Sequence, residues 1–341
     1  MFNTAIGIDL GTSSVVVYVK GKGIVLNEPS VIAYKKADKS ICAVGNLAYR
    51  MLGRNPKEIE VVKPLVDGVI SSYTLTESLM RALLLKTLRH SMISPKLMIC
   101  VPSGVTDVEQ RAVIETARQM NMKEIYIMEE PLAAALGSGL DITEPEGKMV
   151  VDIGGGTSDI AVISGGRAIA SRSLKIAGDE FNEAVLAYLK REKNLIIGPQ
   201  TTEHIKTRIG CVIKREEDIS LMVRGICNIT GLPKAEIISS EELRPEFDGL
   251  VHNITERIKE VLEEISPQLQ ADVLKTGIVL CGGGSLIFGL DKVIQEETGI
   301  KTFYSEDPFA CVAKGAGKAL DFISLDDDPT KRVYKKAYIH E

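Results

Sequence analysis

The stretch that decides the fold lies at residues 150–160 and reads VVDIGGGTSDI. A related stretch, IGIDLGTSSV, lies at residues 6–15. Each contains a β-branched run, an aspartate, a glycine turn, small hydroxyl residues and a second β-branched run. This order predicts a strand, a tight turn and a second strand. Because one copy begins each half of the chain, the repeat predicts an α/β fold made by duplication.

The residue types in the two predicted turns suit phosphate chemistry. Glycines allow backbone N–H groups to approach a phosphate, and hydroxyl groups add donors. The two aspartates, Asp9 and Asp152, suit a hydrated Mg²⁺ ion. Either turn alone could be a plain hairpin, because a single short match is weak evidence. The two together predict a nucleotide clamped between two related lobes.

Composition and missing motifs exclude several classes of protein. The chain of 341 residues is long enough for two domains, and its net charge of −5 without tryptophan gives no indication of nucleic-acid binding. It has neither a P-loop nor a strand-linked G-x-G-x-x-G, which argues against a dinucleotide Rossmann site. The six cysteines form no C-x-x-C pair, so we expect reduced thiols. Without a recognisable signal peptide or transmembrane run, we expect a cytoplasmic protein.

Three further features could contribute to such a site. The segment VLCGGGS at 279–285 predicts a strand and a glycine turn, which is either a surface for a base or ribose or a plain turn. Glu130 follows a predicted strand and could orient a water for attack on phosphate, or could simply begin a helix. Glu203 and Lys206 share one helical face, which by itself favours a surface ion pair.

Local patterns also predict where helices begin. A capping box at residues 106–109 begins one helix. Asp179 is expected to cap a second helix, and Thr201 or Thr202 a third. A strongly amphipathic helix is expected at 250–265.

The order of the motifs resembles a known superfamily. Residues 9–12 (DLGT), 130–131 (EP), 152–157 (DIGGGT), 177–180 (AGDE) and 282–285 (GGGS) follow the order of the actin, Hsp70 and sugar-kinase proteins. Within that superfamily the chain resembles the MreB family of bacterial actins. The segments that carry this closer match are KGIVLNEPSV at 22–31, VPSGVTDV at 101–108 and IAGDE at 176–180. The resemblance covers about residues 6–320.

The resemblance implies an α/β, actin-like duplicated ATPase fold. Each of two lobes would contain a mixed five-stranded sheet with flanking helices and a smaller inserted subdomain. Lobe I would comprise residues 1–142 and about 320–341, with its insertion at about 33–74. Lobe II would comprise residues 143–319, with its insertion at about 180–245.

The resemblance also implies the roles of the site residues. Asp9 and Asp152 would hold Mg²⁺ through water, and Glu130 and Thr157 would position the water that attacks ATP. The ATP-binding residues would be Thr12, Ser13 and Ser14 in the first phosphate loop, Gly155, Gly156 and Thr157 in the second, Glu203, His204, Ile205 and Lys206 beside the ribose and adenine, and Gly283, Gly284, Ser285 and Leu286 around the adenosine. Relatives commonly have Asn at Ser14, so this chain keeps a donor there but changes its contact.

The implied function is that of a filament-forming ATPase of the cell-shape machinery, located at the inner face of the cell membrane. The expected partners are further copies of the chain in paired protofilaments, the membrane surface, membrane shape-determining proteins and cell-wall synthases, and not nucleic acid. Met92 and Ile93 match a membrane-inserting loop of relatives, although this loop could equally pack on its own domain. The alternatives are a non-polymerising actin-fold ATPase or kinase, and a nucleotide-binding structural paralogue with little turnover.

Overall fold

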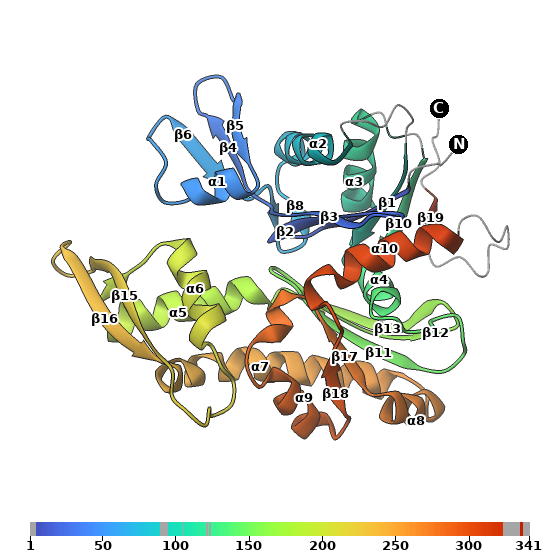
Figure 1. Cartoon of the computed structure of the whole chain (residues 1–341). Coiled ribbons are helices and arrows are strands. Elements are labelled where there is room, and N and C mark those ends of the chain that lie inside the picture. The colour runs from blue at the N-terminus through green and yellow to red at the C-terminus, as the bar shows by residue number, and fades with distance from the viewer. Residues whose placement is uncertain are drawn as a thin grey trace.

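The chain forms two lobes, each built on a large sheet. A computed structural model describes residues 5–88, 95–103, 105–120, 122, 124–322 and 335–336. Each lobe also carries a three-stranded sheet, and these two smaller sheets lie on the same side of the molecule (Figure 1). The predicted α/β fold made by duplication is therefore confirmed.

The first large sheet contains the hairpin that begins the chain. Its strands, in spatial order, are β19 (Lys335–Lys336), β10 (Glu124–Glu129), β9 (Lys96–Val101), β1 (Ala5–Leu10), β2 (Ser14–Val19) and β3 (Gly23–Pro29). The sheet is mixed, because β1 pairs antiparallel with β2 and parallel with β9. It differs from the expected five strands, since the edge strand β19 pairs with β10 and adds a sixth.

The second large sheet repeats the pairing of the first. Its strands, in spatial order, are β13 (Arg167–Leu174), β12 (Ser158–Ser164), β11 (Lys148–Ile153), β17 (Ile278–Cys281) and β18 (Thr302–Tyr304). From β13 the successive pairs are antiparallel, antiparallel, parallel and parallel. The order from β3 to β10 is the same. The repeat seen in the sequence is therefore a repeat of whole sheets.

Helices cover the outer faces of both sheets. The first sheet carries α2 (Tyr73–Leu88) and α3 (Asp107–Gln119). The second carries α7 (Ser240–Glu264), α8 (Pro267–Thr276) and α9 (Leu290–Thr298) (Figure 1). Within the described residues, no helix combines the length and the apolar character needed to cross a membrane.

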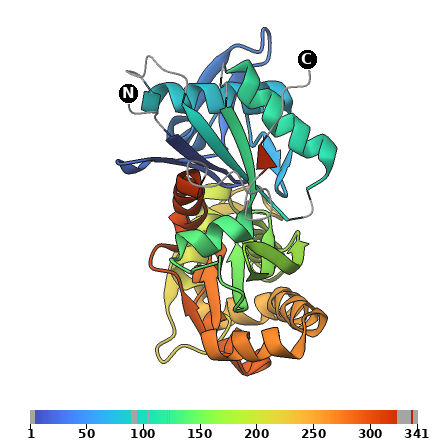
Figure 2. The same cartoon turned by 90° about the vertical axis from the view of Figure 1, so that its right-hand side faces the viewer.

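Two helices, α4 (Glu130–Gly137) and α10 (Cys311–Phe322), cross between the lobes (Figure 2). Their backbones are in direct contact. A Cβ atom added to Gly315 would lie 1.7 Å from the carbonyl oxygen of Ala133, and one added to Gly137 would lie 1.8 Å from that of Cys311. Only glycine fits at these two positions, so the crossing depends on the absence of side chains.

Two smaller sheets lie beside the large ones. The first contains β5 (Ile41–Val44), β4 (Ile32–Lys35) and β6 (Ile59–Val62) beside α1 (Asn46–Met51), and a short hairpin of β7 (Leu65–Val66) and β8 (Val69–Ile70) follows. The second contains β14 (Leu195–Ile196), β15 (Ser220–Cys227) and β16 (Pro233–Ser239), beside α5 (Gly178–Glu192) and α6 (Pro199–Ile209).

Three predicted helix starts were wrong. Ala177, not Asp179, precedes α5, because the Glu180 carboxylate accepts from the backbone N–H of Ala177 at 2.8 Å and supplies the cap from within the helix. Gly198 precedes α6, so neither Thr201 nor Thr202 is its cap. The helix expected at 250–265 begins at residue 240, where Ser239 and Glu242 form a capping box. By contrast, the capping box of Thr106 and Glu109 is present at the start of α3.

Candidate functional site

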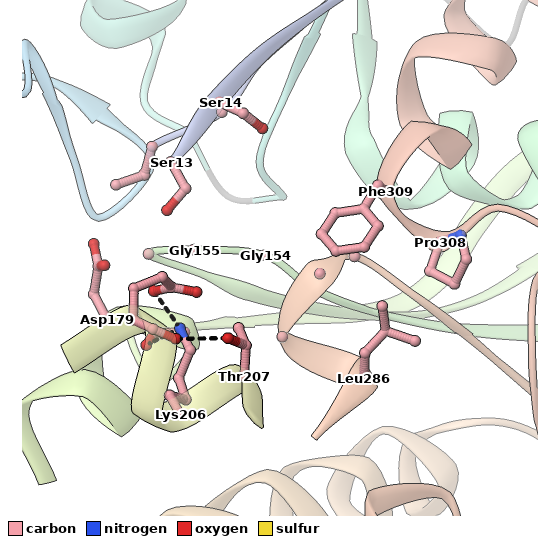
Figure 3. Close-up of a pocket in the computed structure, with 18 of the residues that line it drawn as sticks. Ser13, Ser14, Gly154, Gly155, Asp179, Lys206, Thr207, Leu286, Pro308 and Phe309 are labelled. Atoms are coloured by element: carbon pink, nitrogen blue, oxygen red, sulfur yellow. Dashed lines mark hydrogen bonds and ion pairs between the residues drawn. The ribbon is translucent and has the colours of Figure 1, made fainter. Parts of the chain in front are cut away.

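Both copies of the repeated hairpin line one cavity of about 970 Å³ between the lobes. This volume is at the upper end of the range typical of small-molecule sites. Figure 3 shows the first loop above the cavity and the glycine loop of the second lobe below it. Of the residues expected at the site, those that line the cavity are Asp9, Thr12, Ser13, Ser14, Glu130, Asp152, Gly155, Gly156, Thr157, Glu203, Lys206, Gly283, Gly284 and Leu286.

The two turns have the same internal geometry and face each other. The backbone N–H of Gly11 donates to the backbone carbonyl of Ser14 at 3.1 Å. The backbone N–H of Gly154 donates to the backbone carbonyl of Thr157 at 2.8 Å. A Cβ atom on Gly155 would lie only 2.0 Å from Ser13 Oγ. The loops approach so closely because Gly155 has no side chain, and the result is a cradle of backbone N–H and hydroxyl groups suited to an anion.

Three carboxylates, those of Asp9, Asp152 and Glu130, line the same cavity as the two turns. Burial raises the pKa of Asp9 to about 7. Burial, together with the charge of Asp9, raises the pKa of Asp152 well above its usual value. Burial and the charge of Asp159 do the same for Glu130, the first residue of α4. Such a cluster is electrostatically unfavourable alone and is suited to receive a cation.

The donor set fits Mg²⁺ better than a metal held entirely by protein. Within the described ranges, no three acidic, histidine or cysteine side chains lie close enough to hold a metal ion by themselves. Mg²⁺ commonly uses one or two carboxylates, several waters and the phosphates of a nucleotide. Asp9 and Asp152, which line the same cavity as the two turns, could supply those carboxylates.

Glu203 and Lys206 of α6 line the cavity beside the second turn, because a Cβ atom added to Gly178 would lie 3.2 Å from Lys206 Nζ and 3.5 Å from Gly155 Cα. Lys206 is 7% exposed, so the pair is not the solvated surface pair that their spacing alone favours. Its Nζ donates to the carbonyl of Gly178 at 2.9 Å and to Glu203 Oε2 at 2.8 Å. Asn182 Nδ2 donates to the same carboxylate oxygen at 2.8 Å, and Figure 3 labels Lys206 beside the cavity. These two hydrogen bonds hold the Glu203 carboxylate at the wall of the cavity.

Three of the expected residues do not line the cavity. His204 is exposed on α6, and Ile205 on the same helix is fully buried in the hydrophobic core. Ser285 is also fully buried, and its hydroxyl donates to the carbonyl of Gly282 at 2.7 Å. Ser285 therefore supports the glycine turn from within.

The third glycine segment and an aromatic ring form an apolar wall. Gly282 has a φ of +77°, and η1 (Gly283–Leu286) follows it. The ring of Phe309 covers Gly283 so closely that an added Cβ would lie 2.5 Å from Phe309 Cε1 (Figure 3). Phe309 is 57% exposed, although its ring is large and apolar. With Leu286 and Pro308, it lines an apolar part of the cavity.

The geometry agrees with what known proteins show. A family model described as MreB/Mbl protein matches residues 3–327. The chain belongs to the MreB/Mbl family. Cell shape-determining protein Mbl of Bacillus subtilis is 44% identical over 336 residues, which cover 98% of this chain and 100% of that protein. Cell shape-determining protein MreB of Escherichia coli K12 is 41% identical over 331 residues, covering 95% of each chain.

Solved MreB structures share the fold of this MreB/Mbl chain. Crystal structures of MreB5 of Spiroplasma citri bound to ADP and to AMPPNP each match with a TM-score of 0.90 and 37% identity. The match to the ADP-bound structure covers 94% of this chain and 97% of the MreB5 chain. The resemblance seen in the sequence and the actin-like fold that it implies are therefore confirmed.

The sequence reasoning missed several contacts of the site in this MreB/Mbl chain. Asp159 is 1% exposed, accepts from the Ser103 backbone N–H of the other lobe at 2.8 Å and hydrogen bonds with the Thr157 side chain. The hairpin register could have pointed to Asp159, because this residue pairs with Asp152 on the neighbouring strand. Lys63 forms an ion pair with Asp179 at 2.9 Å across the cavity.

The expected membrane loop at Met92 and Ile93 lies outside the described residues.

Proposed function

We propose that this MreB/Mbl chain is an ATPase that binds ATP with Mg²⁺ between its lobes and assembles into filaments at the membrane. The observation that carries this proposal is the convergence of two hairpin turns and two aspartates on one cavity. The nucleotides named in the MreB5 structures support an adenine nucleotide as the ligand. The names of the Mbl and MreB relatives support a role in cell shape.

The nucleotide would lie with its phosphates between the two turns and its base against the glycine segment. Ser13 and Ser14 from one lobe, and Gly155 and Gly156 from the other, would donate to the phosphates. Glu203 and Lys206 would bind the ribose side, and Phe309 and Leu286 would contact the base. A bound Mg²⁺ ion supplies positive charge to the phosphates and lowers the repulsion between Asp9 and Asp152.

Hydrolysis would depend on positioning and electrostatics, without a covalent intermediate. Glu130, the first residue of α4, lines the cavity and is 9% exposed. It would orient a water toward the terminal phosphate as an acceptor. Thr157 would hold the same water, because the hydrogen bond with Asp159 fixes its hydroxyl. Ion binding at the aspartates favours the ionised form of Glu130, which is the form that accepts.

Self-association is supported by an exposed apolar face. On the sheet of the second subdomain, Met222, Ile226 and Ile237 are 57%, 51% and 60% exposed. Met222 and Ile237 are direct cross-strand partners, so these side chains form one face. Exposed apolar surface of this kind is typical of interaction sites. We propose that it contacts another copy of the chain, and that membrane shape-determining proteins and cell-wall synthases are further partners at the cytoplasmic face of the membrane.

The decisive experiment compares assembly with and without nucleotide. We expect purified chain to sediment and to form filaments by electron microscopy with ATP and Mg²⁺, and to release phosphate at a measurable rate. A non-polymerising ATPase or kinase would release phosphate without sedimenting. A nucleotide-binding structural paralogue would bind ATP with little release. Failure to bind any adenine nucleotide would remove the proposal altogether.

A further inference from the structure

Two buried cysteines lie against each other behind the cavity. Cys281 is the last residue of β17, and Cys311 is the first residue of α10. Their side chains are 0% and 1% exposed, and their Sγ atoms are 3.2 Å apart. The Cys281 thiol donates to the Cys311 sulfur, which in turn donates to the carbonyl of Ala134 at 3.0 Å. Both are free thiols.

The backbone holds the two cysteine segments side by side. The backbone N–H of Gly282 donates to the carbonyl of Pro308 at 2.9 Å, and the backbone N–H of Ser305 donates to the carbonyl of Leu280 at 3.0 Å. These bonds lie on both sides of Cys281. Because disulfide sulfurs are about 2.05 Å apart, the two Sγ atoms need to approach by roughly 1.2 Å.

We propose that Cys281 and Cys311 form a redox modification site, which a hydroperoxide converts into a disulfide. In the first step one of the two thiols loses its proton and its thiolate attacks one peroxide oxygen, so that an S–O bond forms and the O–O bond breaks. The departing oxygen takes a proton and leaves as water or alcohol. In the second step the sulfur of the other cysteine attacks the sulfenic acid, the S–O bond breaks, and its oxygen leaves as water with the thiol proton. The two thiols lose two electrons, and the peroxide gains them.

The surroundings allow either cysteine to react first. Both thiols are donors in the reduced chain, Cys281 to the Cys311 sulfur and Cys311 to the carbonyl of Ala134, so whichever thiol reacts has to lose its proton before it attacks. Pro308, Phe309 and Val312 line the cavity, so Cys311 lies next to the residues of the cavity wall.

The disulfide would change the cavity, and this consequence rests on the proposed function. Cys281 directly precedes the glycine segment, and Phe309 lies two residues before Cys311. Gly283 and Phe309 already touch without room for a Cβ. Drawing the two sulfurs together therefore displaces the wall proposed to contact the base. We expect the oxidised chain to bind an adenine nucleotide at least threefold more weakly than the reduced chain.

The chemical test uses the unmodified chain. Protein treated with hydrogen peroxide is denatured, its free thiols are alkylated, and its peptides are mapped by mass spectrometry. We expect a cross-linked peptide that joins Cys281 to Cys311 and is lost after dithiothreitol. Cys227→Ser is the matched control and should leave this peptide unchanged, whereas Cys281→Ala should abolish it. Full alkylation of both cysteines after peroxide, or their separate conversion to sulfinic acids, would overturn the proposal.

The functional test measures the affinity of oxidised and reduced chain for a fluorescent ATP analogue. The weakening should disappear in the Cys281→Ala variant treated with the same peroxide. Equal affinity of oxidised and reduced chain would refute the coupling to the cavity. Absence of binding by the reduced chain would instead count against the proposed function and leave the peptide result intact.

Discussion

Replacement of Gly155 by alanine tests whether close approach of the two loops is required for turnover. An added Cβ would lie 2.0 Å from Ser13 Oγ and 2.5 Å from Ser13 Cβ. The hydroxyl can rotate away, but Ser13 Cβ is fixed to the backbone. To reach the 3.4 Å of ordinary contact, the two loops have to separate by about 0.9 Å.

A displacement of this size has a calculable effect on the reaction. A misplacement of about 1 Å typically costs on the order of 10²-fold in rate, or about 2.7 kcal/mol of activation free energy. We therefore expect Gly155→Ala to lower the rate of phosphate release about 100-fold. Nucleotide affinity should change less, because the substitution removes no polar group from the cavity.

The assay is single-turnover phosphate release at saturating ATP, with affinity measured separately by a fluorescent analogue. Gly249→Ala is the matched control, because a Cβ added there meets nothing within 4 Å and the residue lies inside α7. That variant should keep its activity and gain about 0.5–1 kcal/mol of stability. If Gly155→Ala released phosphate at the rate of the unmodified chain, the facing loops would not position the phosphates.

Three further outcomes are expected. Glu130→Gln should retain nucleotide binding and lower phosphate release about 10²–10³-fold, and an unchanged rate would reject its proposed role. Lys206→Met should weaken nucleotide binding about tenfold in a titration, because it leaves buried acceptors without a donor; equal affinity would place the ribose elsewhere. The raised pKa values of Asp9, about 7, and Asp159, about 6, mean that the folded chain binds more protons than the unfolded chain. Thermal unfolding without Mg²⁺ and nucleotide should therefore show stability falling from about pH 4 to pH 7, and a rise over that range would contradict the burial of these groups.

The repeated hairpins were predictable because their signal is local. A β-branched run, an aspartate and a glycine turn specify the same chain path wherever they occur, and both copies fold as expected. The cavity followed from the repeat, since both copies line it. The capping box of α3 was likewise readable, because its donor and acceptor are three residues apart.

Other parts of the site depend on partners distant in the sequence. Phe309 has no motif around it, and its contact with Gly283 becomes visible only in the folded chain, where the 3₁₀ turn η2 (Pro308–Ala310) lies against the glycine segment. Ile205 was included with its neighbours in α6, but helical geometry turns it into the core while Lys206 faces the cavity. Asp179 resembled a cap, yet its carboxylate pairs with Lys63, 116 positions earlier in the chain. Sequence spacing alone could not show which of these side chains enters the core, lines the cavity or pairs with a distant residue.

The glycine crossing of α4 and α10 has a mechanical consequence. Where two backbones touch without intervening side chains, sliding by one residue would bring a methyl group against a carbonyl oxygen. The contact therefore opposes translation of one lobe along the other. A rotation about the contact would require no side chain to pass a backbone, and it would widen the cavity most at the rim farthest from the two helices.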